Sequence, residues 1–94
     1  MKVKKMNEVN CYLADEHKKD ARNYYGYLTI EHPELGEFTI SVSIDGKDIR
    51  TDGYPWNFLQ EEEYILNPSQ IEFVNENKKI IGRYVKTDTP TFKI

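Results

Sequence analysis

The sequence predicts a mainly β domain of the α+β class: a small antiparallel sheet or barrel of about five to six strands, with one short helix near residues 55–66. The length of 94 residues suits a single domain, which we expect to span residues 1–94. Seven tyrosines and frequent isoleucine, valine and threonine favour strands, whereas alanine, the best helix former, occurs only at positions 14 and 21. One segment with strict apolar–polar alternation supports the same fold class.

That segment covers residues 37–44 and is typical of an antiparallel strand with one buried face. Its apolar members are Phe38, Ile40, Val42 and Ile44, and its polar members are Thr39, Ser41 and Ser43. Asp45-Gly46 follows as a two-residue hairpin signal, because both residue types tolerate positive φ. We therefore expect residues 47–51 to form the returning strand.

Two further strands are predicted upstream. Residues 24–31 place Leu28 and Ile30 on one face and Tyr25, Tyr27 and Thr29 on the other. Residues 33–36 make the turn into the next strand. The N-terminal segment also fits a helical stripe, but its asparagines are unfavourable inside a helix, so a strand at 8–14 is favoured.

Downstream, residues 70–74 and 80–86 are predicted to form another hairpin around a polar turn at 75–79. Gly82 within the second of these strands indicates a bulge or a close approach of two backbones. Residues 91–94 are expected to add a short last strand.

The predicted helix covers residues 54–66. Pro55 suits a first helical position, and Pro68 would end the helix. An apolar stripe at helical spacing supports it through Phe58, Leu59, Ile65 and Leu66.

Composition argues against several function classes. A net charge of −3 disfavours general affinity for phosphate backbones. The N-terminal sequence lacks the apolar run of a signal peptide, and no segment approaches the roughly 20 apolar residues of a membrane helix. One cysteine, Cys11, allows no internal disulfide, so we expect a cytoplasmic protein.

No residue constellation indicates catalysis, a metal or a cofactor, so we expect none of these. Cys11 with His17 or His32 is the nearest approach to a nucleophile–base pair, but a lone cysteine in an apolar alternation is usually a buried hydrophobe. One cysteine and two distant histidines do not supply a zinc site. Asp45, Asp48 and Asp52 lack the spacing of a calcium loop and suit turns instead.

The main functional hypothesis is a non-catalytic module that binds one larger protein. Tyrosine and tryptophan are frequent interaction anchors, and several of them stand near a run of carboxylates. The candidate partner-binding residues are Tyr25, Tyr27, Tyr54, Trp56, Glu61 and Glu62. A small chain with a single tryptophan usually places it in the core, so the core is favoured for Trp56, and Tyr54 is expected to be the more exposed of the two. Lysine far exceeds arginine, as in AT-rich genomes, which suggests an inhibitor of a host nucleic-acid enzyme or defence system encoded by a phage or mobile element.

The alternative hypothesis is a small protein that binds single-stranded nucleic acid through an OB-like barrel. Such proteins combine basic groups with aromatic side chains on a sheet, and the chain has one basic cluster that fits this description. It consists of Lys78, Lys79, Arg83, Tyr84 and Lys86. On a strand, Tyr84 and Lys86 would share a face and Arg83 would point away from them. The overall acidity of the chain favours another explanation of the cluster, an edge hairpin kept soluble and unpaired by its lysines.

Overall fold

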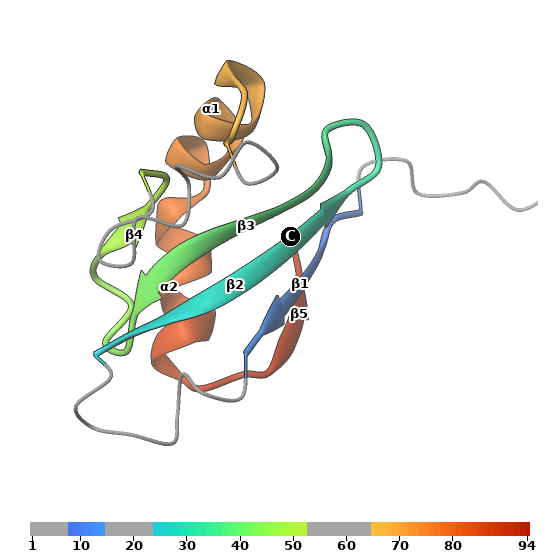
Figure 1. Cartoon of the computed structure of the whole chain (residues 1–94). Coiled ribbons are helices and arrows are strands. Elements are labelled where there is room, and N and C mark those ends of the chain that lie inside the picture. Colours follow the sequence, from blue (N-terminus) through green and yellow to red (C-terminus); the bar gives the residue numbers. More distant parts are fainter. Residues whose placement is uncertain (1–7, 15–23, 53–64) are drawn as a thin grey trace, which may run out of the picture.

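The structure, a computed structural model, describes residues 8–14, 24–52 and 65–94. They form a five-stranded antiparallel sheet with two helices (Figure 1). In chain order the elements are β1 (Asn10–Leu13), β2 (Tyr25–His32), β3 (Gly36–Ser43), β4 (Ile49–Arg50), α1 (Pro68–Glu76), α2 (Lys78–Lys86) and β5 (Thr91–Lys93). The strand order is β4-β3-β2-β1-β5, so β4 and β5 are the two edges of an open sheet. The predicted α+β class is confirmed, and the described strands form a sheet, not a barrel.

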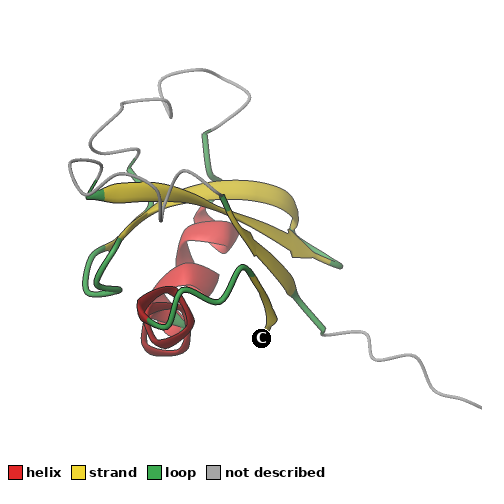
Figure 2. Cartoon of the chain, turned by 90° about the horizontal axis from the view of Figure 1, so that it is seen from below, coloured by secondary structure: helices red, strands yellow, loops and turns green. Residues whose placement is uncertain are grey.

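Both helices cover the same face of the sheet (Figure 2), and the core lies between the two layers. Leu28, Ile30, Ile40 and Val42 on the central strands are fully buried, together with Val74 and Ile81 on the helices. Burying a sheet face under amphipathic helices is the standard way for such a small chain to remove apolar surface from water. Within the described residues, no helix has the length and apolar character needed to cross a membrane.

The predicted strands at 8–14, 24–31, 37–44 and 91–94 are confirmed as β1, β2, β3 and β5, and β4 lies within the predicted return at 47–51. Phe38, Ile40 and Val42 face the helices as expected. Ile44 does not, because β3 ends at Ser43 and Ile44 is exposed in the following loop. Ser41 and Ser43, expected on an open polar face, are completely buried.

The two turns also differ in detail from expectation. The turn at residues 33–36 is confirmed: Gly36 adopts φ of +83°, and Nδ1 of His32 accepts the backbone N–H groups of Glu34 and Leu35 at 3.0 Å each. The loop between β3 and β4, by contrast, has five residues, 44–48, and not two. Ser41 pairs with Arg50, and the N–H of Ser43 donates to the carbonyl of Asp48 at 2.9 Å.

The predicted hairpin of residues 70–74 and 80–86 is wrong, because these residues form α1 and α2. Asn67 and Gln70 make a capping box: each side chain accepts the other residue's backbone N–H at 2.9 Å. Pro68 occupies the first helical position, so it begins a helix and does not end one. Strand propensity at Ile71, Phe73 and Val74 is overridden by this cap and by packing against the sheet.

Two neighbouring predictions concern the residues between and before the helices. The predicted turn at 75–79 is only a short break at Asn77, where α1 gives way to α2. The predicted helix at 54–66 falls mostly outside the described residues, and its last two positions, Ile65 and Leu66, are not helical.

Contacts at both ends of β3 join the sheet to the helices. At one end of β3, the side-chain amide of Gln70 donates to the carbonyl of Leu35 at 2.8 Å, and the His32 ring meets Phe73 edge-on at 4.9 Å. At the other end, Gly46 of the β3–β4 loop lies against Gly82 of α2. A Cβ on Gly46 would lie only 2.9 Å from the carbonyl carbon of Gly82. The predicted close backbone approach at Gly82 is therefore confirmed, although on a helix.

Candidate binding groove

A groove of about 510 Å³ lies between α2 and the β3–β4 loop, beside the contact of Gly46 with Gly82. Its lining residues are Asp45, Gly46, Lys47, Asp48, Ile49, Lys78, Lys79, Gly82, Arg83 and Lys86. The loop approaches the helix so closely because neither glycine has a side chain. The groove therefore has two walls, one from α2 and one from residues 45–49.

The helix wall is basic. Lys79, Arg83 and Lys86 stand at i, i+4 and i+7, which places them on one helical face, and Lys78 begins the helix beside them. Ile81 and Val85 point into the core, so the basic side chains are exposed. Neither these four residues nor Lys47 forms an ion pair with any carboxylate of the described residues. Lys78 interacts electrostatically with Asp48 across the groove, but no described carboxylate lies within ion-pair distance of the helix wall.

The loop wall carries two carboxylates that the fold holds in place. Asp45 accepts the hydroxyl of Tyr24, the hydroxyl of Ser43 at 2.7 Å and the N–H of Lys47 at 3.0 Å. These donors, with Ser43 first, lower the pKa of Asp45 to about 2. Each of the two loop-wall carboxylates accepts a tyrosine hydroxyl: Asp45 from Tyr24, and Asp48 from Tyr25.

Asp48 accepts the hydroxyl of Tyr25 and the guanidinium Nε of Arg50, the latter at 3.1 Å. The tyrosine hydrogen bond is the main cause that lowers the pKa of Asp48, and Arg50 adds to it. Both loop-wall residues are therefore carboxylates at neutral pH.

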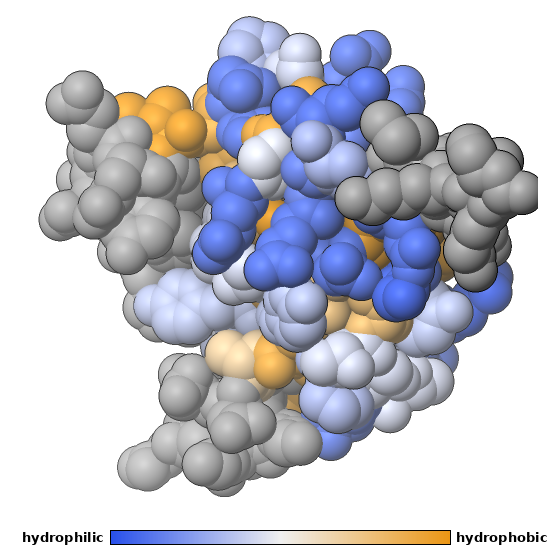
Figure 3. Space-filling view, turned by 90° about the vertical axis from the view of Figure 1, so that its right-hand side faces the viewer, coloured by the Kyte–Doolittle hydropathy of each residue, from blue (hydrophilic) through white to orange (hydrophobic). Residues whose placement is uncertain are grey.

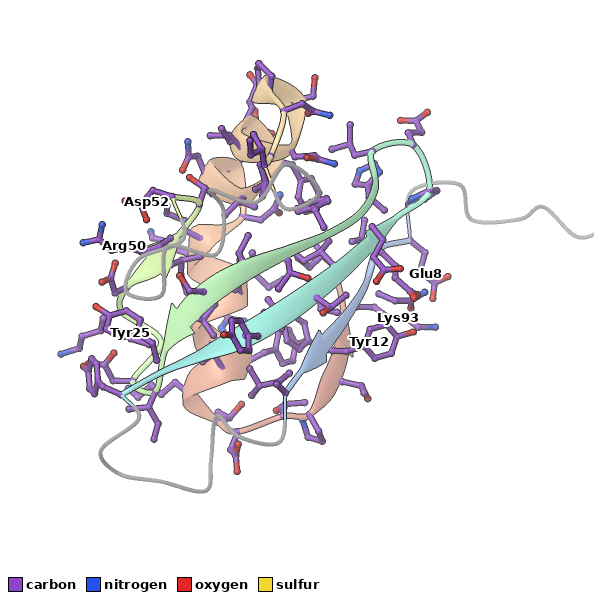
Figure 4. The ribbon with its side chains drawn as sticks, in the orientation of Figure 1. Glu8, Tyr12, Tyr25, Arg50, Asp52 and Lys93 are labelled. Atoms are coloured by element: carbon purple, nitrogen blue, oxygen red, sulfur yellow. The ribbon has the colours of Figure 1, made fainter. Side chains whose placement is uncertain are left out.

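A second hollow of about 320 Å³ continues the groove along β4 and shares Asp48, Ile49 and Lys78 with it. Arg50 lies between two carboxylates there, since its Nη1 also donates to Asp52 at 3.1 Å. Figure 4 shows Arg50 and Asp52 next to each other at this edge of the sheet. The cations on the α2 side and the carboxylates on the β4 side give the combined groove an uneven charge distribution.

Of the predicted nucleic-acid-binding residues, the structure brings together Lys78, Lys79, Arg83 and Lys86, all on the helix wall. Tyr84 does not join them. It is half-buried and stacks on Phe92 with ring centroids 4.5 Å apart and an interplanar angle of 14°. The predicted face pairing of Tyr84 with Lys86 was wrong because it assumed a strand, and a helix turns Tyr84 about 100° away from Arg83.

The predicted partner-binding residues are only partly visible. Tyr54, Trp56, Glu61 and Glu62 lie outside the described residues. Tyr25 and Tyr27 are half-buried on the sheet face that points away from the helices, and the Tyr25 hydroxyl reaches Asp48 beside the groove. Tyr25 thus helps to hold Asp48 of the loop wall in position.

The opposite edge of the sheet has a different character. Lys93 of β5 pairs with Glu8, and the Tyr12 hydroxyl donates to Glu31 at 3.1 Å. These side chains lie on the far side of the sheet from Arg50 (Figure 4). That side of the molecule is mostly hydrophilic, with hydrophobic atoms in separate areas (Figure 3). The lysine at this edge has an internal partner, unlike the cations of the groove.

Two of the three residues weighed for catalysis, Cys11 and His32, lie among the described residues. Cys11 is completely buried in β1, and burial raises the pKa of its thiol to about 12. His32 belongs to the β2–β3 turn, and His17 lies outside the described residues. No group of three or more histidine, cysteine or carboxylate side chains among the described residues could hold a metal ion.

The groove is also lined by Asp45, Lys47 and Asp48, which were not among the binding residues predicted from the sequence. The i, i+4 spacing of Ile81 and Val85 was the signal that could have shown residues 78–86 to be helical and their cations to share a face. The capping box at Asn67 and Gln70 marks the start of α1 only. Comparisons of the chain with protein-family models, curated proteins and solved structures found no match.

Proposed function

We propose that this chain is a non-catalytic module that binds one larger protein, and that its groove receives a segment of that protein carrying carboxylates. The observation that carries this proposal is the convergence of Lys47, Lys78, Lys79, Arg83 and Lys86 on one groove without ion-pair partners among the described residues. Unpaired cations gathered in a groove attract and orient an anionic partner.

Two observations favour a protein over single-stranded nucleic acid. Binders of single strands stack bases on exposed aromatic rings, whereas the aromatic residue of the basic cluster, Tyr84, is already stacked on Phe92. The chain as a whole carries a net charge of −3, which opposes a long polyanion. Nucleic-acid binding is therefore the second candidate, with the basic helix wall as its support.

A narrower form of the proposal is an inhibitor that acts in the cytoplasm on a host nucleic-acid enzyme or defence protein and is encoded by a phage or mobile element. Its support is compositional: ten lysines against three arginines, and abundant isoleucine and asparagine. A small chain that occupies the site of a larger protein needs a binding surface and no chemistry of its own.

The test is a pull-down from a host lysate treated with nuclease, using wild type, Arg83→Gln and Lys93→Gln. Arg83→Gln removes a charge from the helix wall, while Lys93→Gln removes the same charge from the far edge of the sheet. We expect one protein to be retained in stoichiometric amount by wild type and Lys93→Gln and lost from Arg83→Gln. Equal retention by Arg83→Gln would exclude the groove as the binding site, and a partner that disappears with nuclease would favour the second candidate.

A further inference from the structure

The two walls of the groove carry opposite charges at close range. The helix wall presents Lys78, Lys79, Arg83 and Lys86, and the loop wall presents Asp45 and Asp48 with Lys47 between them. From Lys78 to Lys86 the helix rises about 12 Å, which corresponds to an extended segment of about four residues. A ligand lying in this groove can contact residues of both walls.

Hydrogen bonds within the fold hold both loop-wall carboxylates in place. Asp45 is held by Tyr24, Ser43 and the backbone of Lys47, and Asp48 is held by Tyr25 and Arg50. Hydrogen bonds from these five groups keep both carboxylates in position. Their low pKa values mean that a ligand cannot easily neutralise them by protonation.

We propose that Asp45 and Asp48 are specificity residues, which exclude nucleic-acid backbones from the groove and restrict it to an extended protein segment with carboxylates at alternate positions. This inference rests on the proposed function. Successive side chains of an extended segment point to opposite sides, so carboxylates at every second residue can all face α2. The intervening side chains, neutral or basic, then face Asp45 and Asp48.

A phosphate backbone cannot present anions to the helix wall and neutral or basic groups to the loop wall. It carries a negative charge at every nucleotide, and its bases are uncharged at neutral pH, so it offers no cationic group to Asp45 and Asp48. A phosphate that approaches the cations of the helix wall is also brought toward the carboxylates of the loop wall. Selectivity against the wrong ligand then comes from repulsion, while affinity for the right one comes from the helix wall.

The test measures binding of three fluorescent probes at low salt by anisotropy. They are a peptide of four alternating Glu-Lys pairs, a peptide of four glutamates followed by four lysines, and a ten-nucleotide oligo(dT). We expect wild type to bind the alternating peptide more tightly than the blocked peptide, although both have the same composition and net charge. We also expect it to bind the oligonucleotide weakly.

The double variant with Asp45→Asn and Asp48→Asn should reverse this preference. Coulomb's law in water at about 8 Å gives roughly a twofold effect for each carboxylate–phosphate pair, so oligonucleotide binding should tighten about fivefold. Binding of the alternating peptide should weaken, because its lysines lose their partners. Thermal unfolding of each variant checks that the loop is intact.

A second variant avoids disturbing the hydrogen bonds of the loop. Lys47→Glu adds a carboxylate to the same wall, and only the backbone of Lys47 donates to Asp45. It should weaken oligonucleotide binding further relative to the alternating peptide. Unchanged ratios of peptide to oligonucleotide affinity in both variants would overturn the inference while leaving the proposed function in place. Peptide binding that is unaffected by Arg83→Gln would instead contradict the proposed function.

Discussion

Replacing Gly82 by alanine tests whether the contact between the β3–β4 loop and α2 holds the groove together. A Cβ at position 82 would lie 3.4 Å from the carbonyl carbon of Gly46 and closer still to its oxygen. The obstacle is backbone, so it cannot be relieved by a change of rotamer. Overpacking of this kind costs about 1–3 kcal/mol or more.

The helix itself would gain from the substitution, since alanine is favoured over glycine inside a helix by about 1 kcal/mol. The clash outweighs this gain because both backbones are fixed, one by α2 and the other by the pairing of β3 with β4. We therefore expect Gly82→Ala to lower the free energy of unfolding by about 1–2 kcal/mol, which corresponds to a loss of roughly 4–8 °C in Tm per kcal/mol.

Two other glycines provide matched comparisons in the same unfolding assay. Gly36 has φ of +83° and open space around it, so Gly36→Ala introduces backbone strain alone, at about 1 kcal/mol. Gly46 has φ of +71° as well as the contact with Gly82, so Gly46→Ala should cost about 3 kcal/mol.

The double variant of Gly46 and Gly82 should lose less than the sum of the two single losses, because a displaced loop no longer meets the second Cβ. A Gly82→Ala protein as stable as wild type, or more stable, would refute the reasoning. It would mean that helix propensity alone governs this position and that the loop is free to move away from α2.

Three further predictions concern other parts of the fold. In urea titrations, His32→Ala should lower the free energy of unfolding by about 1–2 kcal/mol, because it removes the acceptor for two N–H groups and the ring contact with Phe73. His32→Asn keeps an acceptor and should lower it by about half as much. Cys11, with its thiol pKa raised to about 12, should react with iodoacetamide only when denaturant opens the core, and fast alkylation of the folded chain would contradict its burial. Because the pKa of Asp45 is lowered from 3.8 to about 2, its ionised form contributes stability above pH 3.8 that is lost as pH falls through about 2. Tm should therefore decline over this range, and Asp45→Asn should flatten the decline. A pH profile of Tm that the variant leaves unchanged would show that Asp45 is not the cause.

Much of the sheet was determined by local sequence. Alternation in residues 37–44 and 24–31 specifies which face is buried, and a shift of one residue would expose Ile30 and Ile40, so the register has little freedom. The turn at 33–36 needs positive φ at its end, which Gly36 supplies at no steric cost. These features depend on neighbours within a few positions, and sequence patterns report such neighbours directly.

The helices and the groove depended on tertiary structure. Residues 70–86 contain enough isoleucine, valine and aromatic residues to favour strands, and only the apolar face of the sheet made an amphipathic helix pair the better way to bury them. Helical spacing then put Lys79, Arg83 and Lys86 on one face and turned Tyr84 toward Phe92. Asp45 and Asp48 reached them because Gly46 and Gly82, 36 positions apart in the chain, let two backbones touch, a contact that no local pattern contains.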